Sequence, residues 1–290
     1  MWLVVSLDSS PSQAGSWVQF QTPFGNLDVE LLDHEKPVTV QNFLRYVQEV
    51  YPTNHVLMHR CLPGFVLQGG GYFVRDRDST NDFGGAGRVS RFPVITNEFL
   101  VGAKQSNLFG TIAMAKQAGV TNSASSEWFF NLGNNSTNLD VQNGGFTVFG
   151  RVMEGTNVLR RFNGLSKFVS ETNCEFFGIV DMECFFNDPA VSTFTDTPVT
   201  YVGNRLPTYR ELQYAVIKPL IRLQIHARLD RSRELVWNSF GTAIHRVEYN
   251  DTVLSNNWKL LTQAQGNGDE QRSVDTEAIS GPRFYRVRLE

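Results

Sequence analysis

The sequence has few cysteines and histidines and lacks the motifs in which such residues bind metals. Of its 290 residues, three are cysteines and five are histidines. A disulfide scaffold needs a denser set of cysteines, in even number, so only a pairing of Cys174 with Cys184 stays open, with Cys61 left over. Neither a CxxC nor an HExxH motif occurs, and we therefore expect no metal site.

Long apolar runs and an excess of charge are also missing. The longest apolar stretch covers residues 2–7 and includes Ser6, whereas a membrane-spanning helix needs about 20 residues. The 26 basic and 29 acidic side chains give a net charge of −3, which offers no basic footprint for nucleic acids or anionic membranes. We therefore expect neither a membrane span nor a nucleic-acid partner.

The first residues do not have the pattern of a secretory signal. Residues 1–5, MWLVV, have no lysine or arginine before them, and their apolar core is shorter than that of a signal peptide. Two alternatives stay open: a cytoplasmic protein, or a chain whose natural N-terminus has been trimmed.

The composition and the N-terminal pattern are those of a folded protein. Hydrophobic residues make up 41% of the chain and charged residues 19%, which is typical of globular rather than disordered proteins. Apolar and polar residues alternate over residues 17–32 around a turn at residues 24–26, which predicts two strands. After Pro37, apolar residues recur at helical spacing, and we predict an amphipathic helix over residues 38–50.

The rest of the chain is dominated by short strand-like runs. A second short helix is predicted near residues 154–162. Two helices among many short strands predict an all-β fold, a barrel capped by helices. From about residue 218, strand-like runs separated by turn residues predict a small β-sandwich. We therefore expect two domains, residues 16–217 and 218–290.

An ordered series of motifs lies between residues 59 and 150. HRCLPGFVLQGGG is found at residues 59–71, GTIAMA at 110–115, EWFFN at 127–131 and FTVFG at 146–150. This series resembles the cyclophilin-type peptidyl-prolyl cis-trans isomerases, over roughly residues 18–165. The resemblance implies a closed antiparallel β-barrel capped by two helices. It also implies isomerase activity (EC 5.2.1.8), which turns X–Pro peptide bonds and assists protein folding.

The resemblance further implies which residues form the site. Arg60 matches the family's catalytic arginine, and Gln68 matches the glutamine that orients it and helps hold the substrate. The residues that match the substrate-binding surface are Phe65, Val66, Ala115, Lys116 through its backbone, Phe129, Leu139 and Phe146. The implied substrate is a proline-containing polypeptide, and no cofactor is implied.

The chemistry of X–Pro rotation fits this set of residues. Rotation breaks amide resonance at a cost of about 18–20 kcal/mol, so an X–Pro bond isomerises unaided in roughly tens to hundreds of seconds. The twisted imide nitrogen regains a lone pair, and an arginine that donates a hydrogen bond to it stabilises the twisted state selectively. An apolar pocket anchors the proline ring, so no metal, nucleophile or cofactor is needed.

Strand alternation alone does not assemble this site, and several residues depart from the family's pattern. Simple strand alternation puts Phe65 and Gln68 on opposite faces. Glu127 stands where glutamine is usual, and a carboxylate there could pair with Arg60 and compete with substrate. Asn138 stands where an aromatic residue is common, which argues against tight binding of cyclosporin-like macrocycles. Glu127 and Asn138 motivate a rival hypothesis, a non-catalytic module that binds proline-containing peptides.

The C-terminal segment shows a second resemblance. Residues 246–249, Trp258 and residues 284–287 resemble the small β-sandwich modules appended to secreted bacterial proteins. This resemblance implies a spacer, a surface-attachment module or a carbohydrate- or protein-binding module, and a periplasmic or secreted location. A further alternative makes this domain the functional part and the barrel its scaffold.

Overall fold

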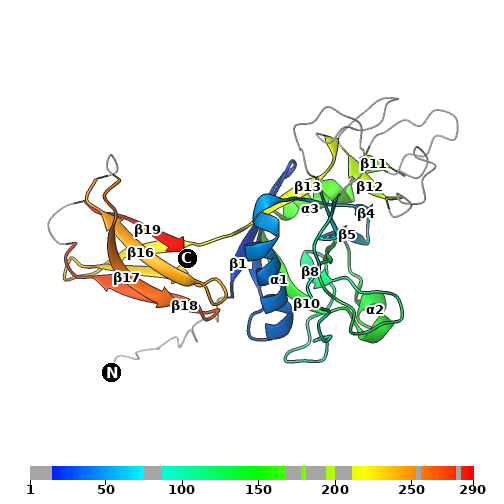
Figure 1. Ribbon diagram of the computed structural model, residues 1–290, viewed down its shortest axis with the longest axis horizontal. Coiled ribbons are helices and arrows are strands. Elements are labelled where there is room, and N and C mark those ends of the chain that lie inside the picture. Colours follow the sequence, from blue (N-terminus) through cyan, green and yellow to red (C-terminus); the bar gives the residue numbers. More distant parts are fainter. Residues whose placement is uncertain are drawn as a thin grey trace, which may run out of the picture. The chain divides into compact units, whose positions relative to one another are not determined.

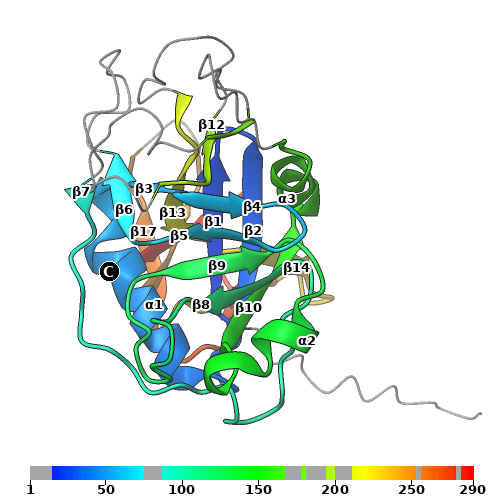
Figure 2. The same cartoon turned by 90° about the vertical axis from the view of Figure 1, so that its right-hand side faces the viewer.

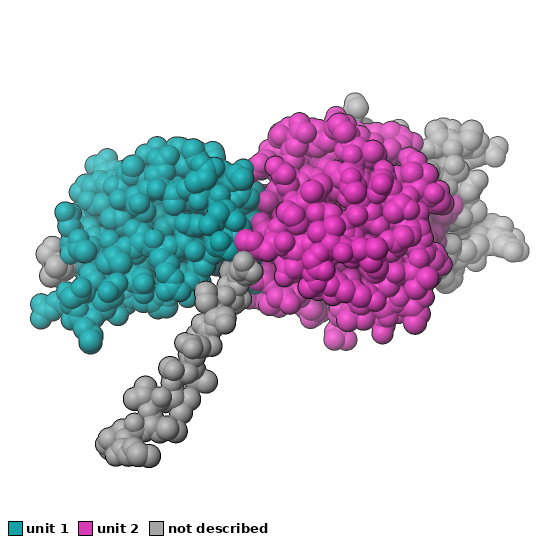
Figure 3. All heavy atoms as spheres, turned by 90° about the horizontal axis from the view of Figure 1, so that it is seen from below, with its two compact units in different colours: residues 1–17, 220–290 teal, residues 18–219 magenta. Residues whose placement is uncertain are grey.

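The structure is a computed structural model that describes residues 15–74, 87–166, 178–180, 194–199, 211–252, 256–278 and 282–290. The chain forms two compact units, one of residues 18–219 and one of residues 1–17 together with 220–290 (Figure 3). Cys174 and Cys184 lie outside the described residues, so their pairing stays a prediction.

An eleven-stranded sheet with antiparallel pairings dominates the larger unit (Figure 2). Its order is β4-β5-β9-β8-β10-β2-β1-β13-β3-β6-β7. The strands are β1 (Trp17–Thr22), β2 (Gly25–Leu31), β3 (His55–Leu57), β4 (Arg60–Leu62), β5 (Val66–Gly69), β6 (Tyr72–Val74), β7 (Gly87–Arg88), β8 (Thr111–Met114), β9 (Trp128–Asn131), β10 (Val148–Glu154) and β13 (Tyr214–Pro219). A separate pair joins β11 (Gly178–Val180) to β12 (Thr197–Val199). The predicted strand pair over residues 17–32 is confirmed as β1 and β2.

The chain itself makes this sheet curl. β4 stands at one edge of the sheet and β3 lies near the other, yet only Met58 and His59 separate them along the chain. The sheet must therefore bend until these positions meet, and Figure 2 shows β3 running on into β4. This is how a sheet becomes a barrel, and the predicted all-β barrel is confirmed.

The inner face of the barrel is a packed apolar core. Cys61 pairs with Leu67, Leu67 with Phe130 and Phe130 with Ile112, one residue from each of four neighbouring strands. Residues that pair directly across antiparallel strands share a face, and all four are fully buried. This row defines which face of the strands is inside.

Two helices accompany the barrel, as predicted. They are α1 (Pro37–Glu49) and α3 (Thr156–Asn163), and α1 begins with a proline whose fixed φ suits the first helical turn. Three short helices were not predicted: α2 (Ser136–Leu139), η1 (Tyr51–Thr53) and η2 (Gln142–Gly144). Within the described residues, no helix has both the length and the apolar character needed to cross a membrane.

The smaller unit holds two three-stranded sheets (Figure 1). One joins β14 (Leu223–Ala227), β15 (Arg233–Asn238) and β18 (Glu270–Asp275), and the other joins β17 (Lys259–Gln265), β16 (Ile244–Asn250) and β19 (Phe284–Leu289). Their shared core includes Leu235 and Trp237 from the first sheet and Val247 from the second. The predicted small β-sandwich is therefore present.

Candidate active site

A row of paired residues crosses the face of the barrel opposite to the buried core. Arg60 of β4 pairs with Gln68 of β5, and Gln68 pairs with Phe129 of β9. Phe129 continues the row to Ala113 of β8 and Val148 of β10. Because directly opposed residues share one face of a sheet, the strand register itself aligns a guanidinium, an amide and an aromatic ring.

An apolar cluster adjoins this row. It contains six of the predicted substrate-binding residues: Val66, Phe129 and Leu139, which are buried, and Phe65, Ala115 and Phe146, which are partly buried against them. The rings of Phe129 and Phe146 meet edge to face at 5.9 Å between centroids, a favoured aromatic geometry. Phe129 of this cluster pairs directly with Gln68, so the cluster adjoins the polar end of the row. An apolar, aromatic surface of this kind is what a proline ring requires as an anchor.

A turn resolves the conflict between Phe65 and strand alternation. β5 begins only at Val66, so Phe65 belongs to the turn that follows β4 and strand alternation does not govern it. The N–H of Phe65 donates to the carbonyl of Leu62 at 2.9 Å, and Gly64 has a φ of +74°, the value that a Pro-Gly type II turn requires. The turn thereby places Phe65 on the same cluster as Val66 and Phe129.

A buried relay of three asparagine amides supports the two aromatic walls. Asn135 donates to the carbonyl of Phe65 at 2.8 Å and to the side-chain oxygen of Asn131 at 2.7 Å. Asn131 donates to Asn107 at 3.1 Å, and Asn107 donates to the carbonyl of Phe146 at 3.1 Å. Sequence reasoning missed this relay. Of its three asparagines, only Asn131 lies within one of the sequence motifs, EWFFN.

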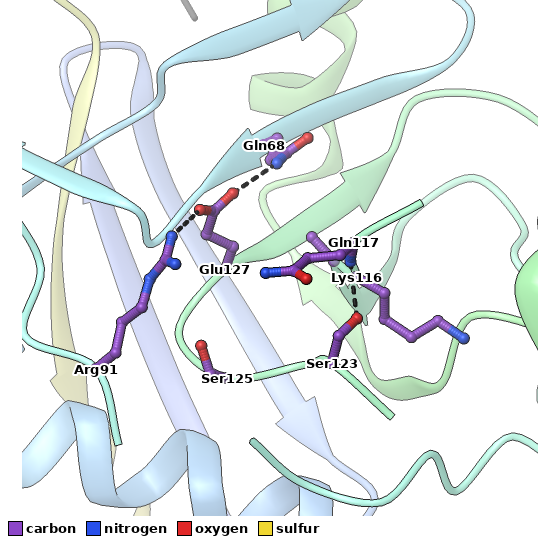
Figure 4. Close-up of a pocket in the computed structure, with 8 residues that line it drawn as sticks. Gln68, Arg91, Lys116, Gln117, Ser123, Ser125 and Glu127 are labelled. Carbon is purple, nitrogen blue, oxygen red and sulfur yellow. Dashed lines mark hydrogen bonds and ion pairs between the residues drawn. The ribbon is translucent and has the colours of Figure 1, made fainter. Parts of the chain in front are cut away.

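A second chain of polar contacts starts at Arg60 and continues through Gln68 and Glu127 to Arg91, and Figure 4 shows its last three members. Arg60 Nη1 lies 3.5 Å from Gln68 Oε1, a long contact. Gln68 Nε2 donates to Glu127 Oε2 at 2.9 Å, and Arg91 Nη2 pairs with Glu127 Oε1 at 3.0 Å. The pairing of Glu127 with Arg60, considered from the sequence, does not form between these two described residues, because Glu127 bonds Gln68 and Arg91 instead.

Lys116 holds the loop that carries Phe146. Its ammonium donates to the carbonyls of Asn143 and Gly145, both at 2.7 Å, and lies 4.7 Å from the centroid of the Phe146 ring. Desolvation by burial lowers the pKa of Lys116 to about 8. The side chain of Lys116 therefore has a structural partner of its own, in addition to the backbone role that the resemblance implies.

A small cavity of about 110 Å³ lies beside the row (Figure 4). It is lined by Gln68, Arg91, Ala115, Lys116, Gln117, Ser123, Ser125 and Glu127. Arg91 and Glu127 were not among the predicted site residues. Arg91 lies at the end of a glycine-rich segment whose alignment the motifs did not define, and Glu127 was read only as a competitor for Arg60.

Burial shifts the pKa values of the two titratable side chains that flank Arg60 in the sequence. Burial raises the pKa of the Cys61 thiol to about 12, so it stays protonated and is not a nucleophile. Burial also lowers the pKa of His59, although Glu127 opposes this effect. Among the described residues, no group of three or more metal-ligating side chains is found.

Comparisons with known proteins agree with this geometry. The family model described as cyclophilin type peptidyl-prolyl cis-trans isomerase/CLD matches residues 17–181. The chain belongs to this family. Its members catalyse rotation about X–Pro peptide bonds, and the cyclophilin domain covers more than half of the chain.

Individual cyclophilins are similar to about half of the chain. A peptidyl-prolyl cis-trans isomerase of Acinetobacter baylyi is 32% identical over 154 residues, which cover 53% of this chain and 74% of the relative. Peptidyl-prolyl cis-trans isomerase B of Escherichia coli is 31% identical over 153 residues, 51% of this chain and 85% of the relative. A crystal structure of a Cryptosporidium parvum cyclophilin with the dipeptide Ala-Pro is 21% identical, with a TM-score of 0.40, and covers 53% of this chain and 89% of its own.

Proposed function

We propose that this cyclophilin isomerises X–Pro bonds by donating a hydrogen bond from Arg60 to the twisted imide nitrogen. The observation that carries the proposal is the row in which Arg60, Gln68 and Phe129 pair directly across three strands. This row places a permanent cation, the one charged group that the reaction needs, near the apolar cluster that would anchor the proline ring.

The energetic argument is selective stabilisation of the twisted amide. A planar amide nitrogen is a poor hydrogen-bond acceptor, because its lone pair is delocalised. An arginine donor therefore interacts with the transition state and little with either planar isomer, and such differential binding raises kcat. Partial burial of Arg60 strengthens the interaction, because it excludes part of the competing water.

The replacement Arg60→Ala tests the proposal. We expect kcat/KM for a proline-containing peptide to fall by about 100-fold or more, the typical cost of losing one preorganised charge-stabilising donor. Arg60→Lys should recover little, because lysine lacks the rigid planar fork of arginine. Arg288→Ala, in β19 of the other unit, is the matched control, because its side chain is 58% exposed.

The result also decides between enzyme and binding module. Circular dichroism and thermal unfolding must show that Arg60→Ala is folded. Equal rates for the folded variant and the wild type would reject the role of Arg60. An X–Pro peptide that binds the wild type without exchange between its cis and trans NMR signals would favour the non-catalytic alternative.

We further propose that the substrates are proline-containing segments of unfolded or extended proteins, whose folding this protein assists. We also propose that it acts outside the cytoplasm. The β-sandwich of residues 220–290 would then attach the isomerase to a surface, a carbohydrate or another protein. The support is the resemblance of this segment to modules of secreted bacterial proteins. Fractionation of the native cells tests the location, and a polysaccharide-binding assay with the full chain tests the attachment.

A further inference from the structure

We propose that Glu127 is a positioning residue for catalysis: its carboxylate holds the Gln68 amide so that the Gln68 oxygen faces Arg60. This inference rests on the proposed function of Arg60. Three side chains take part: Arg60 of β4, Gln68 of β5 and Glu127, which precedes β9. Figure 4 shows Gln68 and Glu127 with the hydrogen bond between them.

The argument is one of donor and acceptor polarity. An ionised carboxylate can only accept hydrogen bonds, and a guanidinium can only donate them. Gln68 lies between the two, with Nε2 2.9 Å from Glu127 Oε2 and Oε1 3.5 Å from Arg60 Nη1. Only one orientation of the amide satisfies both neighbours. With the amide turned over, two oxygens would face each other at one end and two donors would face each other at the other end.

Glu127 is itself restrained, as a positioning group must be. Arg91 pairs with its Oε1 at 3.0 Å, and His59 Nε2 lies 3.6 Å from its Oε2. Its carboxylate packs against Gly71, where a side chain would come within 2.8 Å of Oε1. Its side chain is only 24% exposed. Arg91 and Gly71 therefore limit the positions that the carboxylate can take.

The backbone of Glu127 connects these side chains to Ala115, a predicted substrate-binding residue that directly follows β8. Its carbonyl accepts a hydrogen bond from the N–H of Ala115 at 2.9 Å. Ala115 packs on the same apolar cluster as Phe129. The side chain of Glu127 thus holds Gln68, which orients Arg60, and its backbone holds Ala115 beside the apolar cluster.

The test compares kcat and KM for a set of variants with one X–Pro peptide. We expect Glu127→Ala to lower kcat roughly tenfold, about the value of one hydrogen bond to a charged group, with KM changed little. Glu127→Gln keeps an acceptor and should give an intermediate kcat. In the Gln68→Ala background, Glu127→Ala should cause no further loss, because it acts through Gln68.

Controls separate positioning from other effects. Glu49→Ala removes a carboxylate that pairs with an arginine at the same 3.0 Å, but on the surface of α1, and should leave kcat unchanged. NMR of the Gln68 side-chain amide should show loss of its hydrogen bond in Glu127→Ala and retention in Glu49→Ala.

Two outcomes would overturn the inference. One is an unchanged kcat, or a change in KM alone, in both Glu127 variants. The other is a loss that simply adds to that of Gln68→Ala. The same assay includes Arg60→Ala. If the wild type is active and Arg60→Ala is inactive, the proposed function stands whatever the Glu127 variants show. Failure of the Glu127 inference is therefore distinguishable from failure of the proposed function.

Discussion

At the scale of single residues, Lys116 shows how the site uses polar groups for support rather than for chemistry. Its ammonium binds two carbonyls, of Asn143 and Gly145, in the segment before Phe146. The aromatic ring beside it belongs to the apolar cluster. The cation therefore orders one wall of the proposed proline pocket, although it is not itself a reacting group.

The depressed pKa of Lys116 predicts a pH dependence of stability. Burial lowers it from 10.5 to about 8, so over this range the unfolded chain binds the proton and the folded chain does not. Stability from this group is therefore lowest below about pH 8 and rises as the pH increases towards 10.5. Urea unfolding of the wild type and Lys116→Met at both ends of this range measures the effect. The wild type should gain stability relative to the variant as the pH rises, and parallel pH profiles would contradict the assignment.

At the scale of elements, the β4–β5 turn decides where Phe65 lies. The turn packs closely against residues 132–133, because the N–H of Leu132 donates to the carbonyl of Phe65 at 2.8 Å. A Cβ atom on Gly133 would overlap the carbonyl oxygen of Gly64. Glycine at 133 is therefore required by the approach of two backbones.

Gly133→Ala should displace this turn. We expect a loss of about 1–3 kcal/mol in unfolding free energy, as for other overpacked sites, and a raised KM, because Phe65 moves with the turn. Urea unfolding and isomerase kinetics measure both effects. Gly164→Ala is the control, since its φ is −89° and its nearest neighbours would lie at 3.5 Å or more. Equal behaviour of the two variants would show that the close approach does not matter.

An element could be predicted when its own residues carry the pattern, and it was missed when its structure depends on a partner strand. Helical spacing of apolar residues predicted α1 to within one residue at each end, at 38–50 against Pro37–Glu49. In contrast, β18 has the polar sequence EQRSVD and was not predicted. It forms a strand because it pairs with β15 along the whole length from Arg233 to Asn238. The sequence of residues 270–275 alone does not reveal this partner.

At the scale of the whole molecule, β13 is the strand on which the barrel depends. It lies between β1 and β3, pairing Pro219 with Val18 and Ala215 with Val56. These partners are far apart in the chain, and no other described strand joins them. Removal of β13 would leave two internal strands with unpaired backbone groups.

Two shortened chains test this dependence. A chain that ends at Leu220 keeps β13 and should retain kcat/KM within about twofold, because a unit with its own core can fold alone. A chain that ends at Arg210 lacks β13 and should not unfold cooperatively. Kinetics and thermal unfolding of both chains, beside the full chain, measure the difference. Loss of activity in the longer chain would show that residues 221–290 contribute to catalysis.

The sequence by itself determined the all-β class, the first helix and the resemblance to the cyclophilins, because periodicity, turn residues and ordered motifs can be read locally. The tertiary structure alone decided which groups meet. Gln68 and Glu127 bond although they are 59 residues apart, and Asn135 reaches Phe65 across 70 residues. Such contacts depend on strand register and on turns that break alternation, and these are set by the packing of the whole barrel.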